Sequence, residues 1–145
     1  MPSSTLTPIG PRVSIEDPGT SGTVLYIDDS PVNTMLIERI LVSRPGVVFA
    51  SAPDGRTGLD RAARLAPDLI LLDLMLPDVG GEEVLVELRA DPATRNIPVI
   101  VISAEMDPGV RRRLLDRGAR WCLAKPFDIV ELLGLVDGVL LPQLR

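Results

Sequence analysis

Three aspartates, one serine and one lysine stand directly after short apolar runs of this chain. They are Asp28, Asp29, Asp73, Ser103 and Lys125. A carboxylate at the end of a buried apolar run must be solvated, paired, bound to a metal ion or chemically used. Each of the five also has an ordinary interpretation, as a helix cap, a turn hydroxyl or a solvated charge. One of them alone therefore indicates little, and the question is whether the fold brings them together.

The chain between these residues alternates apolar runs with segments of helical spacing. The apolar runs predict strands at residues 24–27, 47–50, 69–72, 99–102 and 121–124. Helices are predicted from Pro31 until Arg44-Pro45-Gly46 and near residues 55–65, 82–90, 108–117 and 128–140. In the first helix Val32, Leu36 and Ile40 recur at helical spacing. Strict alternation requires right-handed parallel crossovers, which predicts an α/β fold of the (βα)5 type, doubly wound with helices on both faces.

In a parallel sheet of this kind, ligands bind outside the carboxyl ends of the strands. All five polar residues fall at that edge. Three carboxylates roughly 5 Å apart would repel one another by about 3 kcal/mol per pair, so a compensating cation is expected. A hard divalent ion such as Mg²⁺ takes carboxylate and carbonyl oxygens. This set suits a phosphoryl group on Asp73, neutralised by Mg²⁺ and Lys125 and hydrogen-bonded by Ser103.

Composition excludes several other classes of protein. The net charge of -5 argues against nucleic-acid binding, and no apolar run is long enough to span a membrane. The single cysteine excludes an internal disulfide and favours a cytoplasmic location. The chain has no histidine, so catalysis or metal binding by histidine is excluded. Lys125 is the only lysine beside fourteen arginines, which suggests that its position requires a compact charge.

Four motifs together resemble those of a response-regulator receiver domain of two-component signalling. They are Asp28-Asp29, the stretch Leu72 to Gly81, Ser103-Ala104 and Lys125-Pro126-Phe127. The resemblance covers residues 23–141. It implies a flavodoxin-like, five-stranded sheet in the order 2-1-3-4-5.

The same resemblance implies a function and a set of site residues. Asp73 would be the phosphoacceptor, and Mg²⁺ would be held by Asp28 or Asp29, by Asp73 and by the backbone carbonyl of Met75. The phosphodonor would be a sensor histidine kinase or a histidine phosphotransfer protein. Such a domain catalyses only its own phosphorylation and dephosphorylation and signals through protein contacts. The sequence leaves the downstream partner and the formation of a homodimer open.

One position departs from the family pattern. Receiver domains usually carry Tyr or Phe three residues before the lysine, where the aromatic side chain reorients on phosphorylation. Cys122 occupies that position here, with Trp121 displaced by one residue. The phosphorylation chemistry is unaffected, but the usual route of signal readout is in doubt.

The sequence lacks the chemical groups that two rival functions would need. A flavin or nucleotide module would need a phosphate-binding loop where Asp28 and Asp29 stand. A hydrolase acting on outside substrates would need a second carboxylate at Met75. The remaining alternative is an unphosphorylated pseudo-receiver that acts as an interaction module.

Residues 1–22, rich in Pro, Ser, Thr and Gly, are predicted to be a flexible tail before a domain at 23–141, and residues 142–145 form the C-terminal end.

Overall fold

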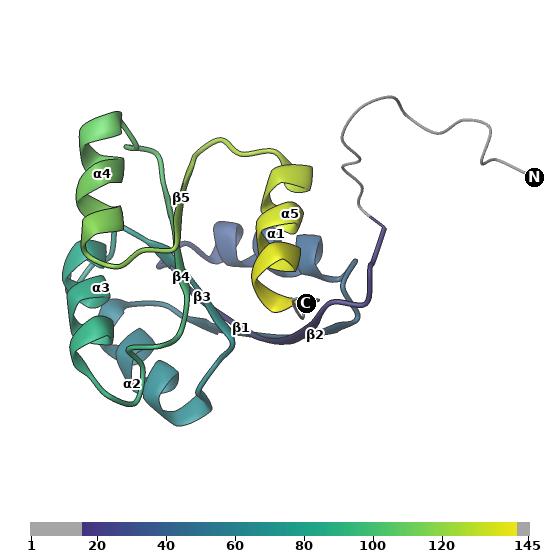
Figure 1. Ribbon diagram of the computed structural model, residues 1–145, viewed down its shortest axis with the longest axis horizontal. Helices are drawn as coiled ribbons and strands as arrows, with labels where there is room; N and C mark the ends of the chain where they lie inside the picture. Colours follow the sequence, from purple (N-terminus) through teal and green to yellow (C-terminus); the bar gives the residue numbers. More distant parts are fainter. Residues whose placement is uncertain (1–15, 142–145) are drawn as a thin grey trace, which may run out of the picture.

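The computed structural model describes residues 16–141, which form five strands alternating with five helices (Figure 1). The elements are β1 (Ser21–Ile27), α1 (Pro31–Leu41), β2 (Gly46–Ala52), α2 (Gly55–Leu65), β3 (Leu69–Asp73), α3 (Gly81–Ala90), β4 (Val99–Ser103), α4 (Pro108–Asp116), β5 (Trp121–Ala124) and α5 (Ile129–Leu140). All strands pair in parallel in the order β2-β1-β3-β4-β5. The predicted (βα)5 fold and strand order are therefore confirmed. No helix in residues 16–141 has the length and apolar character needed to cross a membrane.

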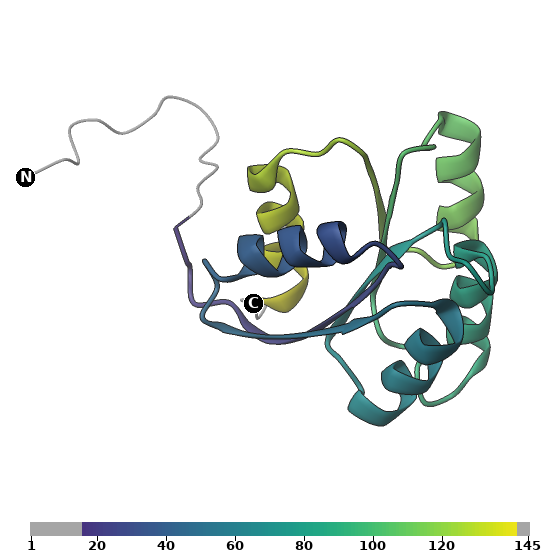
Figure 2. The ribbon, with the colours of Figure 1, turned by 180° about the vertical axis from the view of Figure 1, so that it is seen from behind.

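The sheet separates two hydrophobic clusters because successive strand residues face opposite sides. One cluster joins Leu25, Ile70 and Val101 to side chains of α2, α3 and α4. The other joins Val24, Leu71 and their neighbours to α1 and α5. Figure 2 shows α1 and α5 together on one side of the sheet and the other three helices on the opposite side. β3 and β4 are buried along their whole length, as their uninterrupted apolar sequences require.

Helix starts explain how the chain leaves the carboxyl edge of the sheet. The side chain of Ser30 accepts a hydrogen bond from the backbone N–H of Asn33, and Pro31 follows in the first turn of α1. Asp54, Asp107 and Asp128 cap α2, α4 and α5 in the same way. Because each cap lies a few residues after a strand, the strand ends and their loops are held close to the sheet.

The buried face of α1 coincides only in part with the apolar series Val32, Leu36 and Ile40 that marks this helix in the sequence. Ile37, Ile40 and Leu41 are buried, whereas Val32 and Leu36 are exposed over 75% and 48% of their surface. A step of four residues exceeds one helical turn of 3.6 residues, so the 32-36-40 series drifts around the helix. Only its last member reaches the sheet, and α1 therefore presents apolar side chains to solvent.

A network of polar side chains lies at the amino ends of the strands, opposite the carboxyl edge of the sheet. The Arg44 guanidinium, fully buried, contacts both carboxylate oxygens of Asp137 on α5 at 2.8 Å, and the Thr20 hydroxyl donates to the same carboxylate at 2.6 Å. We refer to Thr20, Arg44 and Asp137 as the amino-edge clasp. β1 begins at Ser21, two residues before the predicted domain boundary at 23, because Ser21 and Gly22 pair with the start of β2. Residues 1–15 and 142–145, which include most of the predicted tail, lie outside the described residues.

Candidate functional site

Lys125 joins two buried aspartates at the carboxyl edge of the sheet. Its ammonium nitrogen lies 3.0 Å from Asp73 Oδ2 and 3.8 Å from Asp28 Oδ2. Asp28 and Asp73 are only 2% and 5% exposed. The Lys125 backbone N–H also donates to the Ser103 carbonyl at 2.9 Å, which fixes the end of β5 beside the end of β4. The structure therefore brings together three of the predicted site residues. We refer to Asp28, Asp29, Asp73 and Lys125 as the acid edge.

The two buried carboxylates are stabilised to different extents. Burial raises the pKa of Asp73 above its ordinary value, and the N–H of Met75 and the ammonium of Lys125 offset this only in part. Burial acts on Asp28 in the same direction. There, however, hydrogen bonds from the Tyr26 hydroxyl, the Ser30 N–H and the Asn33 amide bring the pKa below the ordinary value. Asp73 is thus the carboxylate whose charge is least satisfied by the fold.

The loop after β3 keeps the backbone next to Asp73 in place. Met75 N–H donates to Asp73 Oδ1 at 3.0 Å, and Gly81 N–H donates to the Leu74 carbonyl at 2.9 Å. A Cβ atom on Gly81 would lie 2.4 Å from the Asp73 carbonyl oxygen, so only glycine allows the start of α3 to pack there. The Met75 side chain is 68% exposed and therefore does not pack into the core beside the carboxylate.

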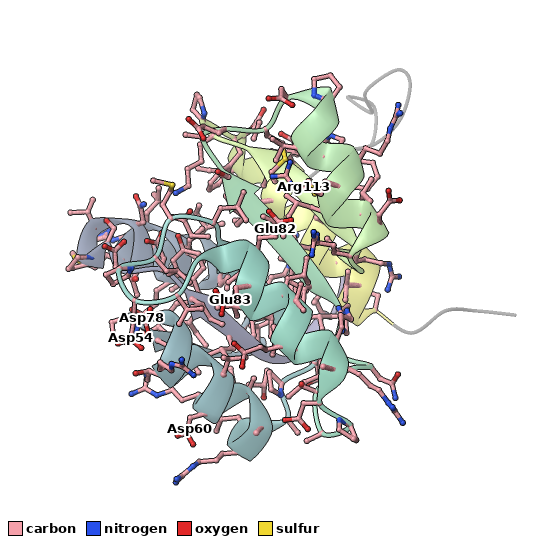
Figure 3. The ribbon with its side chains drawn as sticks, turned by 90° about the vertical axis from the view of Figure 1, so that its left-hand side faces the viewer. Asp54, Asp60, Asp78, Glu82, Glu83 and Arg113 are labelled. Atoms are coloured by element: carbon pink, nitrogen blue, oxygen red, sulfur yellow. The ribbon has the colours of Figure 1, made fainter. Side chains whose placement is uncertain are left out.

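Asp78 fastens the same loop to α2. Its carboxylate accepts hydrogen bonds from the backbone N–H groups of Arg56 and Gly55, at 2.9 and 2.8 Å. These bonds lower the pKa of Asp78 to about 2, as expected for a carboxylate at a helix N-terminus. Figure 3 shows Asp78 beside Asp54 at this end of α2. The sequence analysis did not identify Asp78, although an acid that shortly follows a strand is a known capping signal.

The side chains of Ser103 and Asp29 occupy the same edge without contacting the Lys125 ammonium group. Ser103 is 1% exposed, and its hydroxyl oxygen accepts a hydrogen bond from the Glu105 N–H at 3.2 Å. Asp29 is exposed because it follows Asp28, whose side chain points inward. Among residues 16–141, no three acidic, cysteine or histidine side chains are close enough together to hold a metal ion. The predicted cluster of three adjacent carboxylates is therefore not formed.

The donor groups at this edge nonetheless suit a hard divalent ion. Three carboxylates face a single ammonium group, so negative charge is in excess. Asp29 is exposed, Asp73 is buried next to Lys125, and the Met75 N–H is bonded to the Asp73 carboxylate. Carboxylate and carbonyl oxygens are the ligands that Mg²⁺ prefers. The residues therefore fit a Mg²⁺ site centred on Asp29, Asp73 and the Met75 carbonyl.

Comparison with known proteins assigns the family. The profile of the response regulator receiver domain matches residues 24–137. The chain belongs to the receiver domain family. PleD, a response regulator of Caulobacter vibrioides strain NA1000 / CB15N, is 42% identical over 116 residues, which are 80% of this chain and 25% of PleD. The transcriptional regulator RpaA of Synechocystis is 40% identical over 117 residues, which are 81% of this chain and 48% of RpaA. This receiver domain therefore spans about a quarter to a half of these relatives.

Solved receiver domains share the fold. The receiver domain of sensor histidine kinase PA1611 from Pseudomonas aeruginosa PAO1 superposes with a TM-score of 0.75 at 32% identity, covering 83% of this chain and 98% of that one. That structure has a magnesium ion coordinated in its active site cleft. Chemotaxis protein CheY4 of Vibrio cholerae gives a TM-score of 0.76 at 28% identity, covering 83% and 99%.

Two residues of this receiver domain that contact Asp28 were missed by the sequence analysis. The Tyr26 hydroxyl and the Asn33 side-chain amide both donate to Asp28 Oδ2, the latter at 3.1 Å. Strand alternation could have identified Tyr26, because residues two apart on a strand share a face. Asn33 could have been identified from its place in the first turn of the helix that follows the acids. Tyr26 is 1% exposed. Burial and its bond to Asp28 raise the pKa of Tyr26, so the phenol remains a donor.

The departure at the aromatic position is visible in β5. Cys122 is fully buried, while Trp121 is 45% exposed and lies under the Arg111 guanidinium, 5.5 Å from the ring centre. A second arginine of α4, Arg113, forms an ion pair instead. Arg113 contacts Glu82 of α3 at 2.9 Å, and Figure 3 shows these two side chains facing each other. These contacts tie α4 to its neighbours.

Proposed function

We propose that this receiver domain accepts a phosphoryl group on Asp73 from the phosphohistidine of a sensor histidine kinase or a histidine phosphotransfer protein. The observation that carries the proposal is the 3.0 Å contact between Lys125 and Asp73 in a buried edge that holds a second acid. An unphosphorylated pseudo-receiver would have no use for a buried carboxylate whose charge is incompletely satisfied. Keeping such a group costs stability, which supports a chemical role.

The transfer is a nucleophilic substitution at phosphorus. A carboxylate oxygen of Asp73 forms the new O–P bond while the N–P bond of the donor phosphohistidine breaks. The bonding electron pair leaves with the imidazole, which takes a proton to become neutral histidine. Lys125 offsets the negative charge of the phosphoryl oxygens, and a modest turn of the Ser103 hydroxyl would let it donate to one of them. The Met75 N–H continues to orient the carboxylate.

A divalent ion would be held by Asp29, Asp73 and the Met75 carbonyl, with Asp28 beside them. When bound, Mg²⁺ would supply positive charge that offsets the negative charge of the phosphoryl oxygens. The chain's own contribution is the position of the acids and of Lys125. Asp28 is held by three hydrogen bonds from its surroundings and therefore does not compete as a nucleophile.

The exposed apolar side of α1 is the surface on which we place the phosphodonor. Val32, Met35 and Leu36 are exposed over 75%, 64% and 48% of their surface, and Ile129 at the start of α5 over 48%. A pocket of about 550 Å³ opens between α1 and the start of α5, and Leu36, Lys125 and Ile129 contribute to its lining. Since any donor must bring its phosphoryl group to Asp73, its surface has to cover this edge. An apolar helix face of the donor fits the patch.

Labelling with a small phosphodonor tests the function without a partner protein. The domain is incubated with acetyl phosphate or phosphoramidate and Mg²⁺, and the intact mass is measured. We expect a gain of one phosphoryl group that requires Mg²⁺ and is removed by hydroxylamine, as for an acyl phosphate. Asp73→Asn, which keeps the shape of the side chain, is the matched control and should stay unlabelled. A wild-type chain that gains no phosphoryl group under these conditions would rule the function out.

The docking surface has its own test. Leu36→Arg should slow transfer from a phosphorylated histidine phosphotransfer domain about tenfold or more, because a charge replaces apolar surface in the contact. The same variant should be labelled by acetyl phosphate at the wild-type rate. Leu65→Arg, an equally exposed leucine at the end of α2 (48%), is the matched control and should transfer normally. Equal transfer rates for the two variants would place the donor elsewhere.

The remaining assignments follow from this role. We place the domain in the cytoplasm, where kinases draw on ATP, and this agrees with the single buried cysteine. The domain would act on no outside substrate and would signal through protein contacts. We propose that the domain comprises about residues 23–141 together with the few preceding residues that pair with β2 or hydrogen-bond to α5.

A further inference from the structure

Lys125 has two acids within reach, and its preference for one of them needs an explanation. Its ammonium nitrogen lies 3.0 Å from Asp73 Oδ2 but 3.8 Å from Asp28 Oδ2. Both carboxylates are almost completely buried, so each would gain from an ammonium partner. Lys125 is the only lysine of the chain, and no second compact cation stands at this edge. If the ammonium moved to Asp28, the phosphoacceptor would lose its partner.

Two neutral donors already occupy the Asp28 oxygen that faces Lys125. The Tyr26 hydroxyl and the Asn33 amide both donate to Oδ2, the atom that lies 3.8 Å from the ammonium. The other oxygen, Oδ1, accepts from the Ser30 backbone N–H at 3.0 Å. A carboxylate oxygen has two lone-pair directions, and the tyrosine and asparagine donors occupy both directions of Asp28 Oδ2.

The fold presents the Tyr26 hydroxyl to Asp28 for a simple reason. Tyr26 and Asp28 stand two residues apart at the end of β1, so their side chains emerge on the same face of the sheet. The Tyr26 ring packs in the cluster under α1 and α5, and its hydroxyl points along the strand to the carboxyl edge. Replacing the phenol by an apolar ring would keep this packing and remove only the donor.

We propose that Tyr26, with help from Asn33, is a positioning residue that keeps Lys125 on Asp73 by saturating the competing oxygen of Asp28. The proposal rests on the phosphoacceptor function of Asp73 proposed above. It adds to the acids and the lysine a buried phenol that acts on Asp73 indirectly, through Asp28 and Lys125. It also explains why an aspartate so close to Lys125 is not its main partner.

Tyr26→Phe tests the proposal directly, because the chain contains one tyrosine and one lysine. With isotope-labelled lysine, the Lys125 side chain gives a single set of NMR signals. In Tyr26→Phe without Mg²⁺, we expect these signals to shift as the ammonium moves toward Asp28. The rate of labelling by acetyl phosphate should fall about tenfold or more, the order expected for losing one hydrogen bond to a charged group. Asn33→Ala should change both readouts in the same direction but less.

Thr34→Val is the matched control. Thr34 donates its hydroxyl to the Ser30 carbonyl at 3.0 Å, so this variant loses a hydroxyl bond in the same turn without touching Asp28. It should match the wild type in both readouts. Unchanged Lys125 signals in Tyr26→Phe would overturn the proposal, even if labelling slowed, since the tyrosine would then act through the fold alone. If wild-type protein took up no phosphoryl group, the function would fail, and the Lys125 signals would still decide the role of Tyr26.

Discussion

The two ends of the sheet hold buried carboxylates in opposite ways. At the amino-edge clasp, Asp137 receives two bonds from the buried Arg44 guanidinium and one from Thr20, so its charge is fully matched. At the acid edge, Asp28 and Asp73 share one ammonium group while Asp29 stands exposed beside them. The clasp closes the fold by joining the start of β1 and the end of α1 to α5. The acid edge leaves charge unmatched, and that is the property a cation or a phosphoryl group can use.

The pKa values express the same difference. Burial alone would raise the pKa of Asp137, but the bonds from Arg44 and Thr20 bring it below the ordinary value of 3.8. The pKa of Asp73 is instead raised above 3.8 by burial. A charged Asp137 therefore stabilises the fold, whereas a charged Asp73 destabilises it.

Breaking the clasp should have the largest effect on stability. Arg44→Met leaves the Asp137 carboxylate without its cation, which should lower the free energy of unfolding by about 3 kcal/mol. The double variant Arg44→Met/Asp137→Leu should recover much of this loss, because the unpaired charge is removed as well. Urea unfolding measures both. A loss below about 1 kcal/mol in the single variant would show that the clasp is not a major support of the fold.

Magnesium should stabilise the acid edge and leave the clasp unaffected. At free Mg²⁺ about ten times its dissociation constant, the wild-type fold should gain about 1.4 kcal/mol by mass action. Asp29→Asn and Asp73→Asn should reduce the gain. Arg44→Met should show the full gain, although this variant is less stable than the wild type without Mg²⁺. Thermal unfolding with and without Mg²⁺ provides the measurement. A wild-type midpoint indifferent to millimolar Mg²⁺ would argue against the metal site.

Neutralising the phosphoacceptor should stabilise the fold when no metal is present. Asp73→Asn removes a buried charge whose pKa is raised by burial, so we expect the free energy of unfolding to increase at neutral pH. The penalty of a charged Asp73 exists above its folded pKa and vanishes below the ordinary value of 3.8. The gain should therefore shrink as the pH falls toward 3.8.

The same pH series separates the two ends of the sheet. The pKa of Asp137 is lowered, so its contribution is present above 3.8 and is lost only as the pH falls further. The cost of Arg44→Met should consequently persist at about pH 4, where the benefit of Asp73→Asn is already fading. Parallel behaviour of the two variants across this range would contradict the assignment of matched and unmatched charge.

The smallest effect is expected on β5. Cys122 is buried and too small to exchange much surface between two positions, and Arg111 lies over the exposed Trp121. The phosphoryl mimic beryllofluoride should change hydrogen exchange mainly at residues 103–109 and alter Trp121 fluorescence only slightly. Protection changes at residues 120–124 as large as those at 103–109 would show that a switch operates there without its aromatic residue.

Sequence reasoning succeeded where the pattern lies within a short stretch of neighbouring residues. β3 and β4 end in Asp73 and Ser103, and Asp28 and Lys125 follow directly after β1 and β5. Parallel pairing alone places these positions at one edge of the sheet. Runs such as Leu69 to Leu72 are apolar on both faces, which identified the central strands without ambiguity.

What the sequence could not supply depends on contacts between distant residues or on rotation of a helix. Arg44 and Asp137 are 93 positions apart, so no local pattern pairs them. Val32 and Leu36 have the spacing of a buried face, yet the sheet selects the neighbouring stripe of α1. The spacing of the acids also predicted a cluster of three, whereas in the loop after β1 Asp28 is buried and Asp29 is exposed.

The central claim is that the unmatched charge of the acid edge serves a phosphoryl group on Asp73. Locating that group tests the claim most directly. Trypsin cleaves after arginine, so Asp73 falls in the peptide 65–89, whereas Asp28 and Asp29 fall in 13–39. The labelled domain is reduced with borohydride, which converts an aspartyl phosphate to homoserine, and the peptides are sequenced by mass spectrometry. We predict homoserine at position 73 and unmodified aspartate at 28 and 29. Homoserine at position 28 or 29, or labelling that persists in Asp73→Asn, would contradict the account.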